Sequence, residues 1–195
     1  MPYQGWSECL SSMSGAGPAL ASFTTAVSCI TSAARKTMPP DYWQLGDKAT
    51  QLRIKASGGV SNVVTAQPTF TFEFRLGPTS NIAVFTTGAV LTSTTAHTLV
   101  PWWLDINLTL RAKGSGTSAN FIGQALLASR AFIDAGATAD ITTLGHPTLL
   151  APETSPAVGT GFDSTVANVA DLFVACSVSN AANAITCHQY SLDIN

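Results

Sequence analysis

Few side chains in this chain have the types and the spacing that covalent chemistry requires. The three histidines, His97, His146 and His188, lie in separate segments, and no two have the spacing of metal ligands on one helix or strand. No Gly-x-Ser-x-Gly motif marks a nucleophile, and the nearest carboxylates within one loop are Asp134 and Asp140. We therefore predict that the protein is not an enzyme and has no catalytic residues and no metal site.

Residues 114–119 (GSGTSA) match the loose form of a dinucleotide-binding fingerprint. That fingerprint requires a helix directly after the glycines, because the helix N-terminus binds the pyrophosphate. Residues 120–132 have the pattern of a strand instead, so we predict no bound cofactor.

The four cysteines form no metal or redox motif, because the chain contains no Cys-x-x-Cys sequence. Cys187 and His188 are adjacent, and adjacent strand residues point to opposite faces, so they cannot easily share one metal ion. We predict buried free thiols. The alternative is that Cys176 and Cys187 are neighbours across a C-terminal hairpin.

Basic side chains lie on the polar faces or at the ends of strands that we expect to be neighbours: Arg53, Lys55, Arg75, Arg111 and Lys113. Such a stripe would suit an acidic partner. The alternative is a solvated face whose cations pair with Glu73 and Asp105.

Trp102 and Trp103 are consecutive in a predicted strand, so their side chains point to opposite faces. We expect one of them to pack in the core. The other would then be available at a subunit interface, where aromatic side chains are enriched. An exposed tryptophan that stacks on a sugar ring is the alternative.

The element that must position these side chains is a long strand at residues 100–112. Alternate residues form an apolar and a polar face: Leu104, Ile106, Leu108, Leu110 and Ala112 on one, and Asp105, Asn107, Thr109 and Arg111 on the other. This period of two predicts a half-buried strand in the middle of an antiparallel sheet with one wet face.

Further strands are predicted along the chain, separated by turns rich in glycine, proline and asparagine. They cover residues 51–56 (ended by Gly58-Gly59), 69–76, 82–85, 89–91, 121–132 as the hairpin partner of 100–112, 148–150, and a closing hairpin of 171–178 with 185–192. This succession predicts an all-β fold, an antiparallel β-sandwich of jelly-roll type. An immunoglobulin-like sandwich is the alternative, disfavoured because no Cys-Trp-Cys spacing fits.

The first residues differ in composition from the rest of the chain. Residues 1–34 contain a single charged side chain, Glu8, and several glycines that interrupt regular structure. The stiff sequence Pro39-Pro40 marks the start of a folded domain. We therefore predict an extended N-terminal arm, residues 1–37, lying on a neighbouring subunit, followed by a jelly-roll domain, residues 38–195.

Charged residues make up only 10% of the chain, and the net charge is −2. All nine Lys and Arg lie between residues 35 and 130, whereas residues 131–195 contain six acidic residues and no basic one. A weakly charged surface suits a subunit packed against neighbours, and the overall charge argues against nucleic acid as a partner. No signal peptide or membrane span is visible, so we expect no membrane partner and synthesis in a cytoplasm.

Six short motifs occur in order over roughly residues 25–192: MPPDYWQLG at 38–46, LRIKASG at 52–58, VPWWL at 100–104, GFDST at 161–165, DLF at 171–173 and HQY at 188–190. As a set they resemble a family of tailed-bacteriophage virion proteins. The resemblance implies a jelly-roll virion component that forms trimers and decorates the capsid or the tail, without catalytic residues. The sequence departs from the family at Gly58-Gly59, where its relatives carry Gly-Arg.

We accordingly expect a capsid decoration (cement) protein that binds the major capsid protein as a homotrimer on the outer surface of the virion. The alternative is a tail-associated receptor- or carbohydrate-binding module. The candidate interface residues are Trp102, Trp103, Arg53, Lys55, Arg75, Arg111, His188 and Tyr190.

Overall fold

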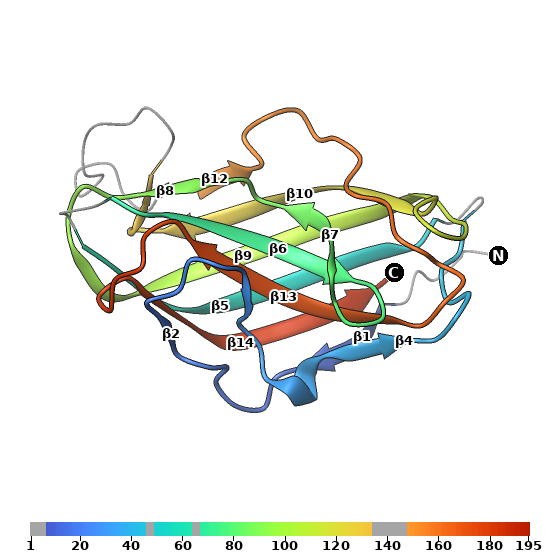
Figure 1. Cartoon of the computed structure of the whole chain (residues 1–195), viewed down its shortest axis with the longest axis horizontal. Helices are drawn as coiled ribbons and strands as arrows, with labels where there is room; N and C mark the ends of the chain where they lie inside the picture. The colour runs from blue at the N-terminus through green and yellow to red at the C-terminus, as the bar shows by residue number, and fades with distance from the viewer. Residues whose placement is uncertain (1–6, 46–48, 64–66, 134–147) are drawn as a thin grey trace.

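The computed structural model describes residues 7–45, 49–63, 67–133 and 148–195. Within these residues the chain forms β-strands and one short 3-10 helix, η1 (Ser32–Ala34), and no α-helix. The strands make two antiparallel sheets, stacked as the two layers of a sandwich (Figure 1). The prediction of an all-β antiparallel sandwich is confirmed. No helix of the described residues is long and apolar enough to cross a membrane.

Sheet 1 contains the longest strands. Its order is β1 (Glu8–Ser12), β14 (Ala184–Ile194), β5 (Gln51–Asn62), β9 (His97–Ala112), β10 (Asn120–Ser129) and β12 (Thr148–Ala151), with β2 (Leu20–Ala21) beside β14. The long strand that the sequence predicts is β9, which lies in the middle of this sheet between β5 and β10. Its predicted hairpin partner is confirmed as β10.

Sheet 2 covers the apolar face of sheet 1. Its order is β11 (Phe132–Ile133), β8 (Val90–Thr92), β6 (Thr69–Leu76), β13 (Asn168–Cys176) and β3 (Val27–Ser28), with β4 (Lys36–Met38) beside β13 and β7 (Ile82–Thr86) beside β6. The bounds of β6 are those predicted from its alternating phenylalanines.

Strands that are far apart in the sequence pair in a nested order. β1 pairs with β14, β3 with β13, β5 with β9, and β6 with both β7 and β8. β1, β5, β9 and β14 lie in sheet 1, whereas β3, β6, β8 and β13 lie in sheet 2. Both halves of the chain therefore contribute strands to both sheets.

The core lies between the apolar faces of the two sheets. The apolar side chains that alternation selects on β9 and β6 are at most 1% exposed: Leu104, Ile106, Leu108, Leu110, Phe70, Phe72, Phe74 and Leu76. Fully burying each such side chain stabilises the fold by about 1.5–3 kcal/mol. These two strands therefore hold the sheets together.

Residues 8–38 are part of the sandwich, whereas the sequence predicts that residues 1–37 form an arm on a neighbouring subunit. β1 and β2 extend sheet 1 along β14, and β3 and β4 extend sheet 2 along β13. Phe23, Cys29 and Ile30 are buried in the same core as the rest of the chain. A segment with few charges can satisfy its backbone by pairing with any open sheet edge. Composition alone therefore did not reveal that this edge belongs to the same chain.

Two further predictions, one of a hairpin and one of a strand end, differ from the structure. The sequence predicts a hairpin of residues 171–178 with 185–192, but β13 lies in sheet 2 and β14 in sheet 1, so the chain crosses between sheets. Short apolar strands have the same pattern whichever sheet they join. In addition, β5 does not end at Gly58-Gly59 but continues through both glycines to Asn62.

Candidate functional site

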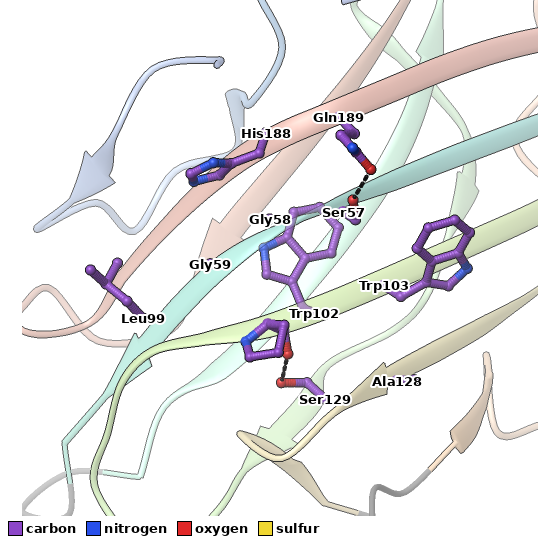
Figure 2. A pocket seen from close by; sticks show the side chains of 11 residues that line it. Ser57, Gly58, Gly59, Leu99, Trp102, Trp103, Ala128, Ser129, His188 and Gln189 are labelled. Carbon is purple, nitrogen blue, oxygen red and sulfur yellow. Dashed lines mark hydrogen bonds between the residues drawn. The ribbon is translucent and has the colours of Figure 1, made fainter. Parts of the chain in front are cut away.

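A groove of about 640 Å³ crosses the outer face of sheet 1 (Figure 2). Four neighbouring strands line it: β5 with Ser57, Gly58 and Gly59, β9 with Leu99, Pro101, Trp102 and Trp103, β10 with Ala128 and Ser129, and β14 with His188 and Gln189. We call it the Trp103 groove. It brings together Trp103 and His188, two of the residues predicted to form an interface.

A β-bulge on β14 turns two consecutive side chains toward this groove. Cys187 pairs with Gly58 and Gln189 pairs with Ser57, so His188 is an extra residue between the two pairs. Both His188 and Gln189 are exposed. A bulge of this kind re-aims side chains in a way that strict alternation does not allow.

Gly58 and Gly59 flatten the floor of the groove for different reasons. A Cβ atom at Gly58 would overlap the backbone carbonyl group of Thr186, so the adjacent strand leaves no space for a side chain. A Cβ atom at Gly59 would make an ordinary contact of 3.5 Å with Leu99. The indole Nε1 of Trp102 donates a hydrogen bond to the same Thr186 carbonyl oxygen at 3.3 Å. Packing therefore requires glycine at position 58, whereas position 59 only keeps the groove open.

Large apolar side chains are exposed in and beside the groove. Leu99 is 68% exposed and Trp103 46%, and on the same outer face Leu126 of β10 is 43% and Leu150 of β12 is 56% exposed. Leu126 and Leu150 are direct partners in register. We call these four residues the apolar row. Large apolar side chains exposed on the same face of three adjacent strands are a feature that contact surfaces often share.

The polar side chains of the groove hold one another in place. Ser57 Oγ donates a hydrogen bond to Gln189 Oε1 at 3.1 Å, and Ser129 Oγ donates one to the carbonyl oxygen of Pro101 at 2.8 Å (Figure 2). Both hydroxyl protons are thereby committed to groups that are not bases, so neither serine is prepared as a nucleophile. The arrangement is suited to binding: a flat apolar surface with an amide and an imidazole at its rim.

The other half of the outer face of sheet 1 is charged. Arg53 of β5 donates two hydrogen bonds to Asp105 of β9, Nε to Oδ1 at 3.0 Å and Nη2 to Oδ2 at 2.5 Å. The hydrogen bond to Asp105 raises the pKa of Arg53. Lys55 is the register partner of Asp105. The alternative interpretation of the basic residues, as cations paired with acids, is thus confirmed for Arg53.

The predicted basic stripe does not form as one surface. Arg75 lies on β6 in sheet 2, where its Nε donates to Glu73 at 2.7 Å and its guanidinium lies 4.3 Å from the centroid of the Phe173 ring. Arg111 is exposed on β9 in sheet 1, with Arg53 and Lys55. The prediction was wrong because alternation assigns a side chain to one face of its strand and does not assign the strand to a sheet.

Two of the predicted interface residues are in the core. Trp102 is 2% exposed and packs against Phe72, with ring centroids 5.1 Å apart. Tyr190 is 4% exposed, and burial raises the pKa of its hydroxyl well above the ordinary value. Of the tryptophan pair, Trp102 is therefore the core residue and Trp103 the exposed one, which confirms the expected division.

The cysteines agree with the prediction in part. Cys29, Cys176 and Cys187 are buried free thiols, whereas Cys9 is exposed. Cys187 is not a hairpin neighbour of Cys176, because their strands belong to different sheets. The Cys187 thiol donates a hydrogen bond to the carbonyl oxygen of Gln189 at 3.1 Å, and the Cys29 thiol donates one to the carbonyl oxygen of Leu172 at 3.3 Å.

Within the described ranges, no group of three or more His, Cys, Asp or Glu side chains is placed to hold a metal ion. His146, Asp134 and Asp140 lie outside the described residues. Comparison of the chain with protein-family models, with curated proteins and with solved structures gives no match.

Sequence reasoning identified Trp103 and His188 but missed Leu99, Ser57 and Gln189. The signal that could have found them is Gly58-Gly59, because glycine inside a strand marks a bulge or a close approach of backbones. Treating the two glycines as the end of a strand hid that signal.

Proposed function

We propose that the sandwich is a jelly roll, the fold that the sequence resemblance implies. A jelly roll is a double sheet of eight strands built from two Greek keys. Such a fold results when a long hairpin of strands rolls up, so that the first strand pairs with the last. The nested pairs β1 with β14, β3 with β13, β5 with β9 and β6 with β8 support this assignment. β10 and β12 then extend sheet 1 beyond the eight strands.

We propose further that the protein is a structural protein of a tailed-bacteriophage virion: a decoration protein that binds the major capsid shell as a homotrimer. The observation that carries the proposal is the apolar row on the outer face of sheet 1. Covering Trp103, Leu126 and Leu150 with a second copy removes apolar surface from water, which stabilises association. The six sequence motifs connect such a subunit with a phage virion.

The structure changes which part of the chain we assign to contacts between subunits. The strands of residues 8–38, β1 to β4, pair with β13 and β14 of their own chain. The described part of the predicted arm therefore does not reach a neighbouring subunit. We assign the contact between copies to the apolar row. The contact with the capsid shell would then use a surface outside the row. The charged half of the outer face around Arg53 and Lys55 is one such surface.

The oligomeric state tests the role of the apolar row. Light scattering on the purified chain should give three times the mass of one chain. Leu126→Lys places a charge in the row and should give monomers. Asn107→Lys, a matched change at an exposed residue of the same face outside the row, should leave the trimer intact. A wild-type chain that stays monomeric at tens of micromolar would contradict the subunit contact.

Composition of the particle tests the virion assignment. Quantitative mass spectrometry of virions purified from the phage that encodes the chain should find hundreds of copies per particle. A handful of copies would place the protein in the tail, and its absence from the particle would overturn the proposal.

A second candidate is a carbohydrate-binding module of the tail, and the Trp103 groove favours it. An exposed indole next to the amide of Gln189 and the imidazole of His188 provides one stacking surface and several hydrogen-bonding groups for a sugar ring. A glycan array should then show binding that Trp103→Ala abolishes and Asn107→Lys leaves unchanged. If the array shows no binding while the trimer forms, the groove is a subunit contact.

A further inference from the structure

A second hollow, of about 220 Å³, adjoins the Trp103 groove on the outer face of sheet 1. Three neighbouring strands line it: β5 with Lys55, Ala56 and Ser57, β9 with Trp103, and β14 with Gln189, Tyr190 and Ser191. We call it the Lys55 hollow. Ser57, Trp103 and Gln189 also line the Trp103 groove, so the two depressions meet at these residues. Figure 2 shows Trp103 and Gln189 at the end of the groove away from Leu99.

The Lys55 side chain brings a positive charge to this hollow. It is half-buried on β5 and forms no ion pair with any described residue. Its register partner on β9, Asp105, accepts hydrogen bonds from Arg53 on both carboxylate oxygens. The acid on the same face of β14, Asp193, is the register partner of Arg53. Both carboxylates are thus grouped around Arg53, which leaves the ammonium group of Lys55 for a ligand.

The amide of Gln189 provides a second donor where the two depressions meet. Ser57 Oγ donates a hydrogen bond to Gln189 Oε1 at 3.1 Å, so the amide oxygen faces Ser57 and the Nε2 protons point elsewhere. Within the described ranges, Nε2 donates no hydrogen bond. The hydroxyl of Ser191 already donates to Asp193 Oδ2 at 3.4 Å. The hollow therefore offers an ammonium group and an amide NH2, two donors that suit a carboxylate.

The strands beneath the hollow argue against an acidic peptide as the ligand. An extended peptide binds a sheet by adding a strand to an open edge. β5 lies between β14 and β9, and β9 lies between β5 and β10, so their main-chain groups already pair within the sheet. Nucleic acid is also disfavoured, because phosphate chains require a concentrated basic face and Lys55 is the only cation that lines the hollow.

The dimensions favour a ligand of at least two rings. Pockets that hold a whole drug-sized molecule are about 300–1,000 Å³. The Lys55 hollow is smaller than this, at about 220 Å³, whereas the adjoining groove, at about 640 Å³, lies within the range. A sugar ring that carries a carboxylate suits the hollow, because its apolar face can stack on the Trp103 indole while the carboxylate reaches Lys55. The next ring of the same oligosaccharide then lies in the groove.

We propose that the Lys55 hollow is the acid-binding end of an elongated carbohydrate site, whose ligand is an oligosaccharide that contains a uronic acid. The uronate ring stacks on Trp103, and its carboxylate accepts hydrogen bonds from Lys55 Nζ and Gln189 Nε2. The neighbouring ring occupies the Trp103 groove. This inference rests on the second candidate function, in which Trp103 is open to a sugar and not covered by a second copy.

The experiment compares acidic oligosaccharides with their methyl esters, which carry no charge. The full chain is titrated onto an array of neutral glycans and of galacturonate, glucuronate and mannuronate oligomers, each beside its ester. At least one acid should bind about fivefold more tightly than its ester, and Lys55→Gln should remove this preference while the ester still binds. Lys113→Gln removes the same charge from an exposed residue just beyond β9 and should keep the preference. Added salt should weaken binding of the acid more than binding of the ester.

The outcomes separate this inference from the function on which it rests. Equal binding of acids and esters, or a preference that Lys55→Gln retains, would overturn the acid-binding role of the hollow and leave the carbohydrate-binding module in place. A preference that Lys113→Gln also removes would reflect overall charge and would overturn that role as well. An array without binding to any glycan, acidic or neutral, would overturn the carbohydrate-binding module and this inference with it.

Discussion

The two sides of sheet 1 differ although the same strands form both. On the inner side, Trp102 packs against Phe72 and is 2% exposed, while on the outer side the next residue, Trp103, is 46% exposed in the groove. The inner side is closed by a second sheet of the same chain. Large apolar side chains on the outer side have no such cover among the described residues. The comparison indicates that the inner side holds the fold together, and the exposed apolar side chains of the outer side support the proposed contact with a second copy.

The largest difference in the free energy of unfolding is expected between variants of the two tryptophans. Trp102→Ala should reduce the free energy of unfolding by about 4 kcal/mol, because it opens a cavity in the core and leaves the Thr186 carbonyl oxygen without its indole donor. Trp103→Ala should change it by less than about 1 kcal/mol. Urea unfolding of the two variants measures both values. Equal losses would show that Trp103 also contributes to the fold of the monomer.

Two adjacent glycines provide the next test. Gly58→Ala should reduce the free energy of unfolding by about 2–3 kcal/mol, because the new Cβ atom overlaps the backbone of β14 and one of the two strands must move. Gly59→Ala should be within about 0.5 kcal/mol of wild type, since its Cβ makes only an ordinary contact with Leu99. Thermal unfolding of the matched pair measures the difference. A large loss for Gly59→Ala would mean that position 59 supports the fold and not only the groove.

Asp171 offers a pH-dependent test of the inner side. Burial raises its pKa, although Ser28 donates a hydrogen bond at 2.7 Å and Arg35 Nε lies 2.8 Å from Oδ2. The folded state therefore binds a proton before the unfolded state does. Asp171 contributes stability that is present below its unfolded pKa and is lost as the pH rises through its folded pKa.

Wild type should accordingly gain stability relative to Asp171→Asn as the pH falls toward about 4. The gain should be about 1.4 kcal/mol for each pH unit over which only the folded state is protonated. Urea titrations at pH 7, 6, 5 and 4 measure this difference. A change in the opposite direction would mean that the Arg35 pairing outweighs burial.

The smallest effect is expected for the Arg53–Asp105 pair on the outer side. The Arg53 side chain is 44% exposed, so solvent and salt screen its interaction with Asp105. A double-mutant cycle with Arg53→Ala and Asp105→Ala should give a coupling of about 0.5–1 kcal/mol that decreases in high salt. A coupling of several kcal/mol would show that this half of the outer face is as important to the fold as the core.

Much of the fold follows from local patterns. The alternation over Thr69–Leu76 and along β9 correctly selects which side chains are buried, because successive strand residues point to opposite faces. The groove could not be predicted in the same way. Its His188 and Gln189 side chains share one face only because a bulge interrupts the alternation, and the bulge forms where Gly58 faces Cys187.

The sequence by itself determined the two faces of each strand, the all-β class and the division of Trp102 and Trp103 between core and surface. Only the tertiary structure decided that Arg75 is in a different sheet from Arg53, that β1 to β4 complete the sandwich, and that Cys176 and Cys187 lie in different sheets. The physical reason is the distance along the chain between the residues that decide each feature. Alternation is a property of neighbouring residues, whereas sheet membership depends on pairing between residues that are distant in the chain and present similar faces to several partners.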